Sequence, residues 1–184
     1  MEKFVNLLTV YRIIASPIIF ISLIYFDLKL LTLFLFISAA ISDFLDGYLA
    51  RLFNVESKIG EILDPIADKI LLVSTLLTIV MFLESIFIGL MSLFLISREF
   101  WVSALRIGTS SSNNKLSVTF LAKVKTATQF LALSTYFISI QQKFAMGLLI
   151  ADFILFLSLI LSLKTALDYT RTFYIQLDHP GNAN

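Results

Sequence analysis

The chain has 184 residues, of which 58% are hydrophobic and 15% charged, and its formal net charge is +1. A soluble core of this size cannot hide so much apolar surface, so the composition excludes an ordinary soluble globular protein and favours a membrane protein. The near-neutral charge, without a basic run interleaved with aromatic residues, argues against nucleic-acid binding. The absence of cysteine excludes disulfides, thiol catalysis and zinc–thiolate sites.

Six apolar runs predict six membrane-spanning helices and hence an all-α, polytopic membrane protein. We expect these helices at residues 5–26, 29–50, 60–83, 86–107, 121–141 and 144–168. The first run shows no small-residue cleavage signal, so we interpret it as a retained span. Residues 1–172 are expected to form a single transmembrane domain, and residues 173–184, with the sole histidine His179, a polar C-terminal tail.

The basic residues divide unequally between the two sides that six spans would create. If the N-terminus is cytoplasmic, 12 of the 14 Lys and Arg residues lie on or near that side, and only Lys29 and Lys143 lie opposite. This imbalance follows the positive-inside rule and predicts that both termini and the connectors around 51–59 and 108–119 face the cytoplasm. No inverted repeat of the kind found in transporters is evident.

Four of the eight aspartates lie within 26 positions, at Asp43, Asp46, Asp64 and Asp68. Each pair recurs at helical spacing, so each lies on one face of its helix, and two facing helices can bring all four carboxylates together. Four charged aspartates facing lipid would cost on the order of 10–14 kcal/mol. We therefore expect them to face one another near the cytoplasmic surface.

Clustered carboxylates repel one another unless cations neutralise them, so this pattern predicts a pair of divalent cations. An all-oxygen ligand set favours Mg²⁺ or Mn²⁺, two per active site, and such a pair can clamp a diphosphate for phosphoryl transfer. Gly47, Ala50 and Gly60 remove bulk from the same faces, and Pro65 is expected to tilt the second pair. The alternative is that the aspartates are merely solvated helix ends, but four in register favour the functional interpretation.

At these residues the sequence resembles the CDP-alcohol phosphotransferase family, whose signature is Asp-x2-Asp-Gly-x2-Ala-Arg-x8-Gly-x3-Asp-x3-Asp. All eight fixed positions are present between Asp43 and Asp68. The resemblance implies six transmembrane helices and a homodimer, with membrane lipids as partners. It also implies transfer of a phosphatidyl group from CDP-diacylglycerol to an alcohol with release of CMP.

The resemblance also implies roles for individual residues. The four aspartates match the metal ligands, and Asp68 matches the catalytic base that takes the acceptor's proton. Residues matched to the donor nucleotide site are Thr9, Gly47, Ala50, Arg51 and Gly60.

Further matches at residues 6–12 with Pro17, 64–69, 98–106 and 122–126 resemble the bacterial members that act on sn-glycerol 3-phosphate. They imply a bacterial inner (cytoplasmic) membrane protein with its active site facing the cytoplasm. One departure is Ala122, where many members have glycine.

An acceptor with its own phosphate needs a basic pocket. Arg98, Arg106, Lys123 and Lys125 bracket one connector, and arginine and lysine both bind phosphate well. The alternative for these residues is topological, since cytoplasmic loops are basic in any membrane protein. Two alternatives remain for the whole chain: the same chemistry on phosphatidylglycerol, inositol phosphate or serine, and a non-enzymatic cation transporter.

Overall fold

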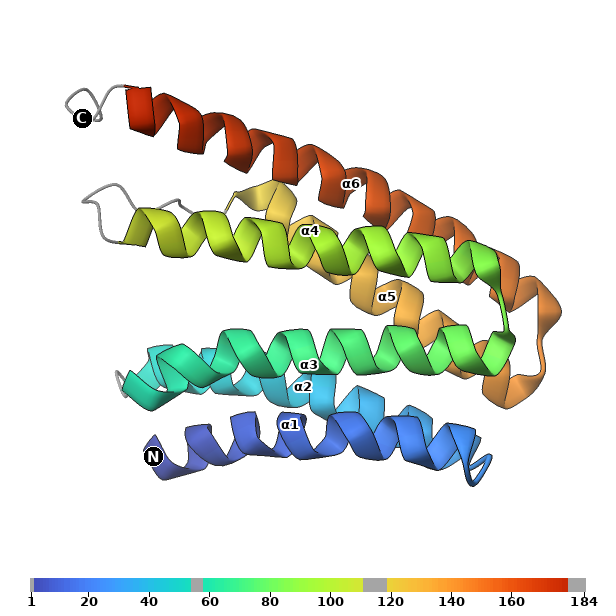
Figure 1. Ribbon diagram of the computed structural model, residues 1–184. Coiled ribbons are helices and arrows are strands. Elements are labelled where there is room, and N and C mark those ends of the chain that lie inside the picture. Colours follow the sequence, from blue (N-terminus) through green and yellow to red (C-terminus); the bar gives the residue numbers. More distant parts are fainter. Residues whose placement is uncertain (1, 54–57, 111–118, 179–184) are drawn as a thin grey trace.

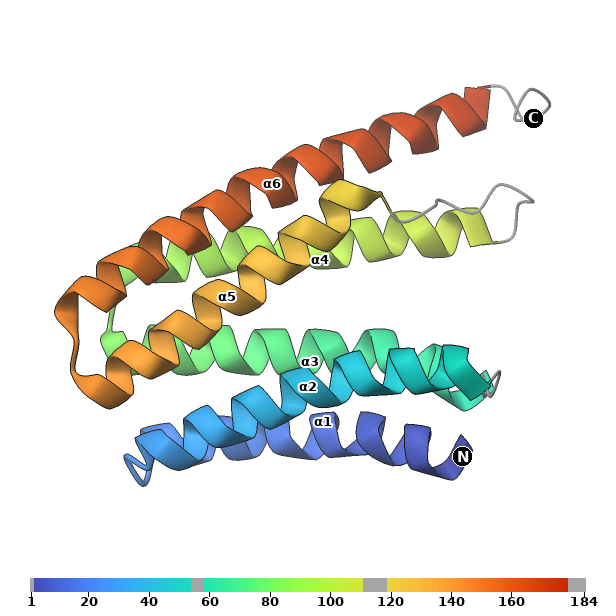
Figure 2. The same cartoon turned by 180° about the vertical axis from the view of Figure 1, so that it is seen from behind.

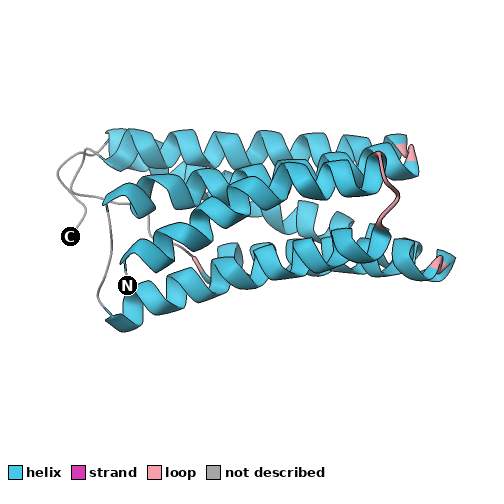
Figure 3. Cartoon of the chain, turned by 90° about the horizontal axis from the view of Figure 1, so that it is seen from below, coloured by secondary structure: helices cyan, strands magenta, loops and turns pink. Residues whose placement is uncertain are grey.

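The computed structural model describes residues 2–53, 58–110 and 119–178. Within these ranges no side chain is described at 2–5, 44, 46–53, 58–59, 61, 109–110 and 176–178. The described chain forms six helices and, in these ranges, no strand (Figures 1 and 3). They are α1 (Glu2–Ile24), α2 (Lys29–Phe53), α3 (Lys58–Leu83), α4 (Ile86–Ser110), α5 (Phe120–Gln142) and α6 (Ala145–Asp178). The prediction of an all-α, six-helix chain is confirmed.

The last helix is longer than the sequence suggested. We expected it to end at residue 168 and the polar tail to begin at 173, but α6 continues to Asp178. In this extra stretch Tyr169 is buried in a small cluster with Val102 and Leu105 of α4, and Phe173 packs against the same cluster. This apolar contact with α4 stabilises helix where the hydropathy of the sequence has already fallen.

The bundle consists of two halves of three helices. In one half α1 packs on α2 and α3, and in the other α6 packs on α4 and α5 (Figure 1). The halves meet where α2 contacts α5 and where α3 contacts α4. Figure 2 shows α2 and α5 crossing in front of α3 and α4. Four helices, two from each half, therefore border the space between the halves.

Three tight turns lie at one end of the bundle, opposite the N- and C-terminal ends of the described chain (Figure 1). Each turn holds one charged residue with positive φ, Asp27 at 50°, Glu84 at 49° and Lys143 at 52°. After the last turn Gly147 approaches α5 closely, since a Cβ built there would lie 2.2 Å from Ser139 Oγ. Only glycine fits this contact without movement of its neighbours.

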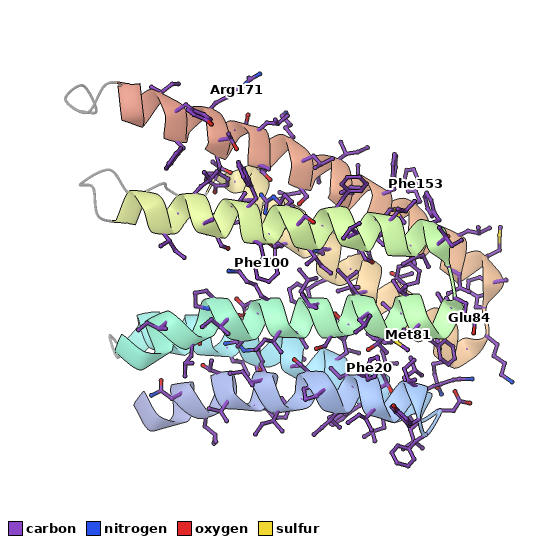
Figure 4. All side chains as sticks on the ribbon, in the orientation of Figure 1. Phe20, Met81, Glu84, Phe100, Phe153 and Arg171 are labelled. Atoms are coloured by element: carbon purple, nitrogen blue, oxygen red, sulfur yellow. The ribbon has the colours of Figure 1, made fainter. Side chains whose placement is uncertain are left out.

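The outer surface is apolar over most of the bundle. Four helices are long and apolar enough to cross a membrane, by length and composition over the described residues: Asn6–Ile24, Ile62–Leu83, Ile86–Gly108 and Ala145–Ile175. Large side chains such as Phe153, labelled on α6 in Figure 4, point away from the bundle, and Phe153 is 69% exposed. Lipid is the solvent that such a surface requires, and the chain is a multi-pass membrane protein.

Candidate active site

The site begins with a polar stripe on α1. Thr9, Arg12 and Ser16 follow one another at helical spacing on one face, and all three are fully buried in an otherwise apolar helix. Ser16 Oγ donates a hydrogen bond to the Arg12 carbonyl oxygen at 2.7 Å, so its hydroxyl is satisfied locally. The stripe directs the Arg12 guanidinium into the interior of the α1–α3 half.

Arg12 lies at the centre of the predicted aspartate cluster. Its Nη1 donates to Asp43 Oδ1 of α2 at 2.6 Å and to Asp68 Oδ1 of α3. Its Nη2 donates to Asp64 Oδ1, also of α3, at 3.2 Å. Thr9 Oγ1 also donates to Asp64 Oδ1, at 2.6 Å. The buried guanidinium of Arg12 thus binds three carboxylates from two neighbouring helices. It supplies the counter-charge that such a cluster requires.

The three carboxylates are only partly covered. Their side chains are 35% exposed for Asp43, 36% for Asp64 and 48% for Asp68, whereas the Arg12 side chain is 0% exposed. Over the described residues no group of three acidic or histidine side chains is arranged to hold one metal ion directly. The guanidinium lies between the carboxylates. The donor set itself fits a hard divalent cation, because partly exposed carboxylate oxygens already converge on one positive charge.

The predicted donor residues are described unevenly. Gly60 is buried near the start of α3, and α3 continues through Pro65. The side chains of Asp46, Ala50 and Arg51 and the surroundings of Gly47 lie outside the described part of the chain. The structure therefore brings three of the four predicted metal ligands together.

A second charged cluster, which we call the Glu99 cluster, lies in the other half. Glu99 of α4 accepts from Arg98 Nη1 at 3.0 Å and from Lys125 Nζ of α5. Arg98 Nε also donates to the Ser162 carbonyl oxygen of α6 at 2.9 Å, and Arg98 Nη2 donates to Thr165 Oγ1. Arg98 and Lys125 are both buried, so these contacts tie together the three helices α4, α5 and α6.

The other two predicted basic residues lie nearer the surface. Arg106 donates from Nη2 to the Tyr169 hydroxyl at 3.0 Å, and its guanidinium carbon lies 5.0 Å from the centre of the Tyr169 ring. The Tyr169 hydroxyl also accepts from the Thr119 backbone N–H at 3.4 Å, just before α5 begins. Lys123, in the first turn of α5, is exposed. Arg106 and Lys123 are therefore the more accessible pair of the four.

Two adjoining cavities join the two halves of the bundle. The outer cavity, of about 660 Å³, is lined by all four predicted basic residues together with Asp43 and Glu99. The inner cavity, of about 240 Å³, is lined by Asp43 and Asp68 from one half and by Glu99, Arg106 and Lys125 from the other. Asp43, Glu99, Arg106 and Lys125 belong to the walls of both, so the aspartates and the basic residues face a common space.

The two cavities differ in charge. Among described residues the outer cavity has four basic against two acidic side chains, whereas the inner cavity has three of each sign. Lys69 is the third base of the inner cavity, and its Nζ lies 5.6 Å from the centre of the Phe100 ring, which Figure 4 shows between α3 and α4. An anionic group is favoured in the outer cavity, and a group of little net charge fits the inner one.

The residues at the centres of the two charged clusters, Arg12 and Glu99, received no individual role in the sequence analysis. Arg12 counted there as one of the basic residues near the cytoplasmic side and as part of a matched segment, and Glu99 only as part of a matched segment. A local signal did exist for Arg12, because it follows Thr9 by three residues within an apolar run, which places both on one helix face. No comparable signal pointed to the pairing of Glu99 with Lys125, which lie 26 residues apart.

Comparison with known families gives the class of protein. The family model described as CDP-alcohol phosphatidyltransferase matches residues 3–164, which is most of the chain. The chain belongs to this family, and the resemblance drawn from the eight fixed positions of the signature is confirmed.

Individual relatives narrow the class. The chain is 41% identical over 137 residues to the CDP-diacylglycerol–glycerol-3-phosphate 3-phosphatidyltransferase of Cereibacter sphaeroides, an alignment covering 72% of this chain and 62% of that protein. The enzyme of the same name from Blochmanniella floridana is 44% identical over 131 residues, 68% of each chain. The one from Rickettsia bellii is 34% identical over 172 residues, 91% of this chain and 93% of that protein. The match thus spans less than two thirds of the first relative and almost the whole of the last.

Proposed function

We propose that the chain transfers the phosphatidyl group of CDP-diacylglycerol to sn-glycerol 3-phosphate, giving phosphatidylglycerophosphate and CMP. Family membership supports the reaction type, and the names of the relatives support both substrates. The observation that carries the proposal is the inner cavity, where Asp43 and Asp68 share one space with Arg106 and Lys125. A donor held at the aspartates and an acceptor held at the basic residues meet there.

The acceptor's phosphate belongs in the outer cavity, where basic residues outnumber acidic ones. Arg106 and Lys123 are the residues most available to it, since Arg98 and Lys125 are buried and bonded within the Glu99 cluster. In this proposal Arg98 and Lys125 contribute mainly the positive potential of the cavity wall. A phosphate held there leaves the rest of the acceptor directed towards Asp68 in the inner cavity.

The donor's diphosphate belongs at the four aspartates, with Thr9, Gly47, Ala50, Arg51 and Gly60 lining the nucleotide. Asp43, Asp46, Asp64 and Asp68 would hold two Mg²⁺ or Mn²⁺ ions, which neutralise a bound diphosphate and stabilise the attacking and leaving oxygens. Arg12 acts as a positioning residue in this proposal, because its buried guanidinium forms ion pairs with three of the four carboxylates and so holds them close together.

The chemistry is a single displacement. The primary hydroxyl of the acceptor attacks the phosphorus that carries the diacylglycerol group. A new oxygen–phosphorus bond forms while the bond from that phosphorus to the oxygen of CMP breaks. Asp68, half-exposed at the inner cavity, takes the hydroxyl proton. No covalent enzyme intermediate is required.

The orientation in the membrane follows from charge. The Lys and Arg residues concentrate at the end of the bundle that carries the aspartates, so we place this end on the cytoplasmic side of a bacterial inner membrane. In this orientation α2 and α5 cross the membrane beside the four helices that are long and apolar enough to span it. The active site then faces the water-soluble acceptor and CMP. We further propose a homodimer, as the family resemblance implies.

The test is the lipid product formed from a panel of acceptors. Purified protein in detergent with Mg²⁺ and CDP-diacylglycerol is given glycerol 3-phosphate, glycerol, serine, inositol phosphate or phosphatidylglycerol, and CMP release and product mass are measured. We expect CMP release and a phosphatidylglycerophosphate mass with glycerol 3-phosphate alone. Equal use of another alcohol would refute the acceptor assignment while leaving the family intact. Absence of CMP release with every acceptor would refute the proposed reaction.

A further inference from the structure

The uncharged polar residues of the inner cavity have different hydrogen-bonding states. Among described residues there are three of them, Ser103, Thr126 and Gln129. Ser103 Oγ donates to the Glu99 carbonyl oxygen at 2.8 Å, and Thr126 Oγ1 donates to the Ala122 carbonyl oxygen at 3.1 Å. Both hydroxyls are therefore satisfied by the backbone of their own helix.

Gln129 is not satisfied in this way. The residue is 3% exposed, and its Nε2 is buried with no hydrogen-bond partner in the part of the chain that the structure describes. A buried amide donor without a partner is costly and uncommon in folded proteins, so such a group calls for a partner that binds later. The last torsion of a glutamine side chain is soft, and rotation about it can turn the amide towards the cavity that Gln129 lines.

The position of Gln129 indicates which part of a ligand it meets. Lys125, Gln129 and Leu133 lie at successive four-residue steps on the face of α5 that lines the inner cavity. Lys125 also lines the outer cavity, whereas Gln129 does not. Each step along the helix is about 6 Å, so Gln129 lies one helical turn beyond Lys125, away from the outer cavity and in the inner cavity that Asp68 also lines.

The charges of the inner cavity favour a neutral ligand group at this depth. Its basic and acidic side chains are equal in number among described residues, and Gln129 adds a neutral donor. A phosphate is better placed in the outer cavity, where basic side chains are in excess. The ligand group that suits Gln129 is therefore a hydroxyl located between the phosphate and the reacting oxygen.

We propose that Gln129 is a specificity-determining residue that donates a hydrogen bond to the secondary hydroxyl of the acceptor. This inference rests on the proposed function, in which the phosphate of glycerol 3-phosphate lies in the outer cavity and its primary hydroxyl lies at Asp68. The secondary hydroxyl is then on the carbon between them, at the level of Gln129. The bond fixes the acceptor's carbon chain and selects acceptors that carry a hydroxyl there.

The test compares glycerol 3-phosphate with 3-hydroxypropyl phosphate, which lacks only the secondary hydroxyl. The unmodified chain should prefer glycerol 3-phosphate by roughly tenfold to a hundredfold in kcat/KM. Gln129→Leu removes the donor at similar size, so kcat/KM for glycerol 3-phosphate should fall by about that factor while the value for 3-hydroxypropyl phosphate stays nearly constant. The preference should then approach unity, with the KM for CDP-diacylglycerol unchanged.

Controls separate this role from a structural one. Gln142→Leu makes the same substitution at an exposed position at the far end of α5 and should leave the preference intact. Gln129→Met serves as a second variant if Gln129→Leu does not fold. Equal losses for both acceptors, an unchanged preference, or a raised KM for CDP-diacylglycerol would each overturn the inference. If the unmodified chain does not use glycerol 3-phosphate but uses another acceptor, the proposed function itself fails.

Discussion

The two halves of the bundle use charged residues in opposite ways. In the α1–α3 half one buried arginine is surrounded by three partly exposed carboxylates, Asp43, Asp64 and Asp68. In the α4–α6 half one carboxylate, Glu99, is flanked by two buried bases, Arg98 and Lys125. The first arrangement leaves negative charge facing the shared cavities, and the second leaves positive charge there.

In the proposed function, this difference keeps the two anionic substrates at separate sites. A diphosphate at the aspartates needs additional cations, whereas a phosphate in the outer cavity needs no cation other than the basic side chains that line it. The inner cavity, with equal numbers of acidic and basic side chains, lies between the two. A substitution that removes a charge facing the cavities from one half should therefore affect the use of one substrate and not of the other.

The largest effect should come from the aspartates. Changing Asp43, Asp46, Asp64 or Asp68 to Asn removes one charged ligand at nearly constant volume, so CMP release should fall by several orders of magnitude with folding retained. Asp68→Asn is the most informative, because it also removes the proposed base, and it should still bind CDP-diacylglycerol. The control is Asp27→Asn, since Asp27 lies in an exposed turn at the other end of the bundle. Near-normal CMP release from Asp46→Asn in Mg²⁺ would refute the metal site.

The next largest effect should come from the buried cation of the same half. Arg12→Met leaves three carboxylates close together without their counter-charge, so the free energy of unfolding should fall by about 3–5 kcal/mol. The measurement is the thermal unfolding midpoint in detergent. Added Mg²⁺ should raise that midpoint more for Arg12→Met than for the unmodified chain, because the carboxylates then lack any other cation. An unchanged midpoint would show that Arg12 does not hold the cluster together.

Much of this fold was predictable, because the determining pattern is local. Six apolar runs placed the six helices, and the helical spacing of the aspartates indicated the faces on which Asp43, Asp64 and Asp68 converge. The end of α6 was not predictable in the same way. Residues after Leu167 become more polar, and the helix is maintained there by contacts of Tyr169 and Phe173 with α4, which depend on tertiary structure.

The pairing of charges was harder still to predict. The sequence offers 14 basic and 13 acidic residues, and hydropathy does not indicate which ones meet. Arg12 reaches Asp68 across 56 residues and Lys125 reaches Glu99 across 26, so both contacts appear only when the helices pack. For the same reason the sequence did not show that the four basic residues around one connector separate into a buried pair, Arg98 and Lys125, and an accessible pair, Arg106 and Lys123.

A smaller effect is expected from the Glu99 cluster. Glu99→Gln keeps the shape of the side chain but leaves Arg98 and Lys125 as neighbouring buried cations, so the free energy of unfolding should fall by about 2 kcal/mol. The double variant Glu99→Gln with Lys125→Met should recover part of that loss, because the unpaired cation has gone. Strictly additive losses in the thermal midpoint would show that the pair does not stabilise this half.

The smallest of these effects concerns the mouth of the outer cavity, where Lys123 is exposed and lies on the cavity wall. Lys123→Ala removes one charge-assisted contact to the acceptor's phosphate, so the KM for glycerol 3-phosphate should rise roughly tenfold. The KM for CDP-diacylglycerol should barely move, because in the proposed function the donor binds at the aspartates of the other half. Added salt should raise the KM of the unmodified chain more than that of the variant, since screening weakens the same contact.

The matched control for this variant is Lys143→Ala, which removes an exposed lysine just beyond the opposite end of α5. Both substitutions change the net charge of the chain by the same amount, so a long-range effect of charge alone would appear in both. A rise in KM confined to Lys123→Ala would locate the effect at the cavity mouth. If the two variants behave alike, or if the KM for CDP-diacylglycerol rises as much as that for glycerol 3-phosphate, the separation of donor and acceptor between the two halves is wrong.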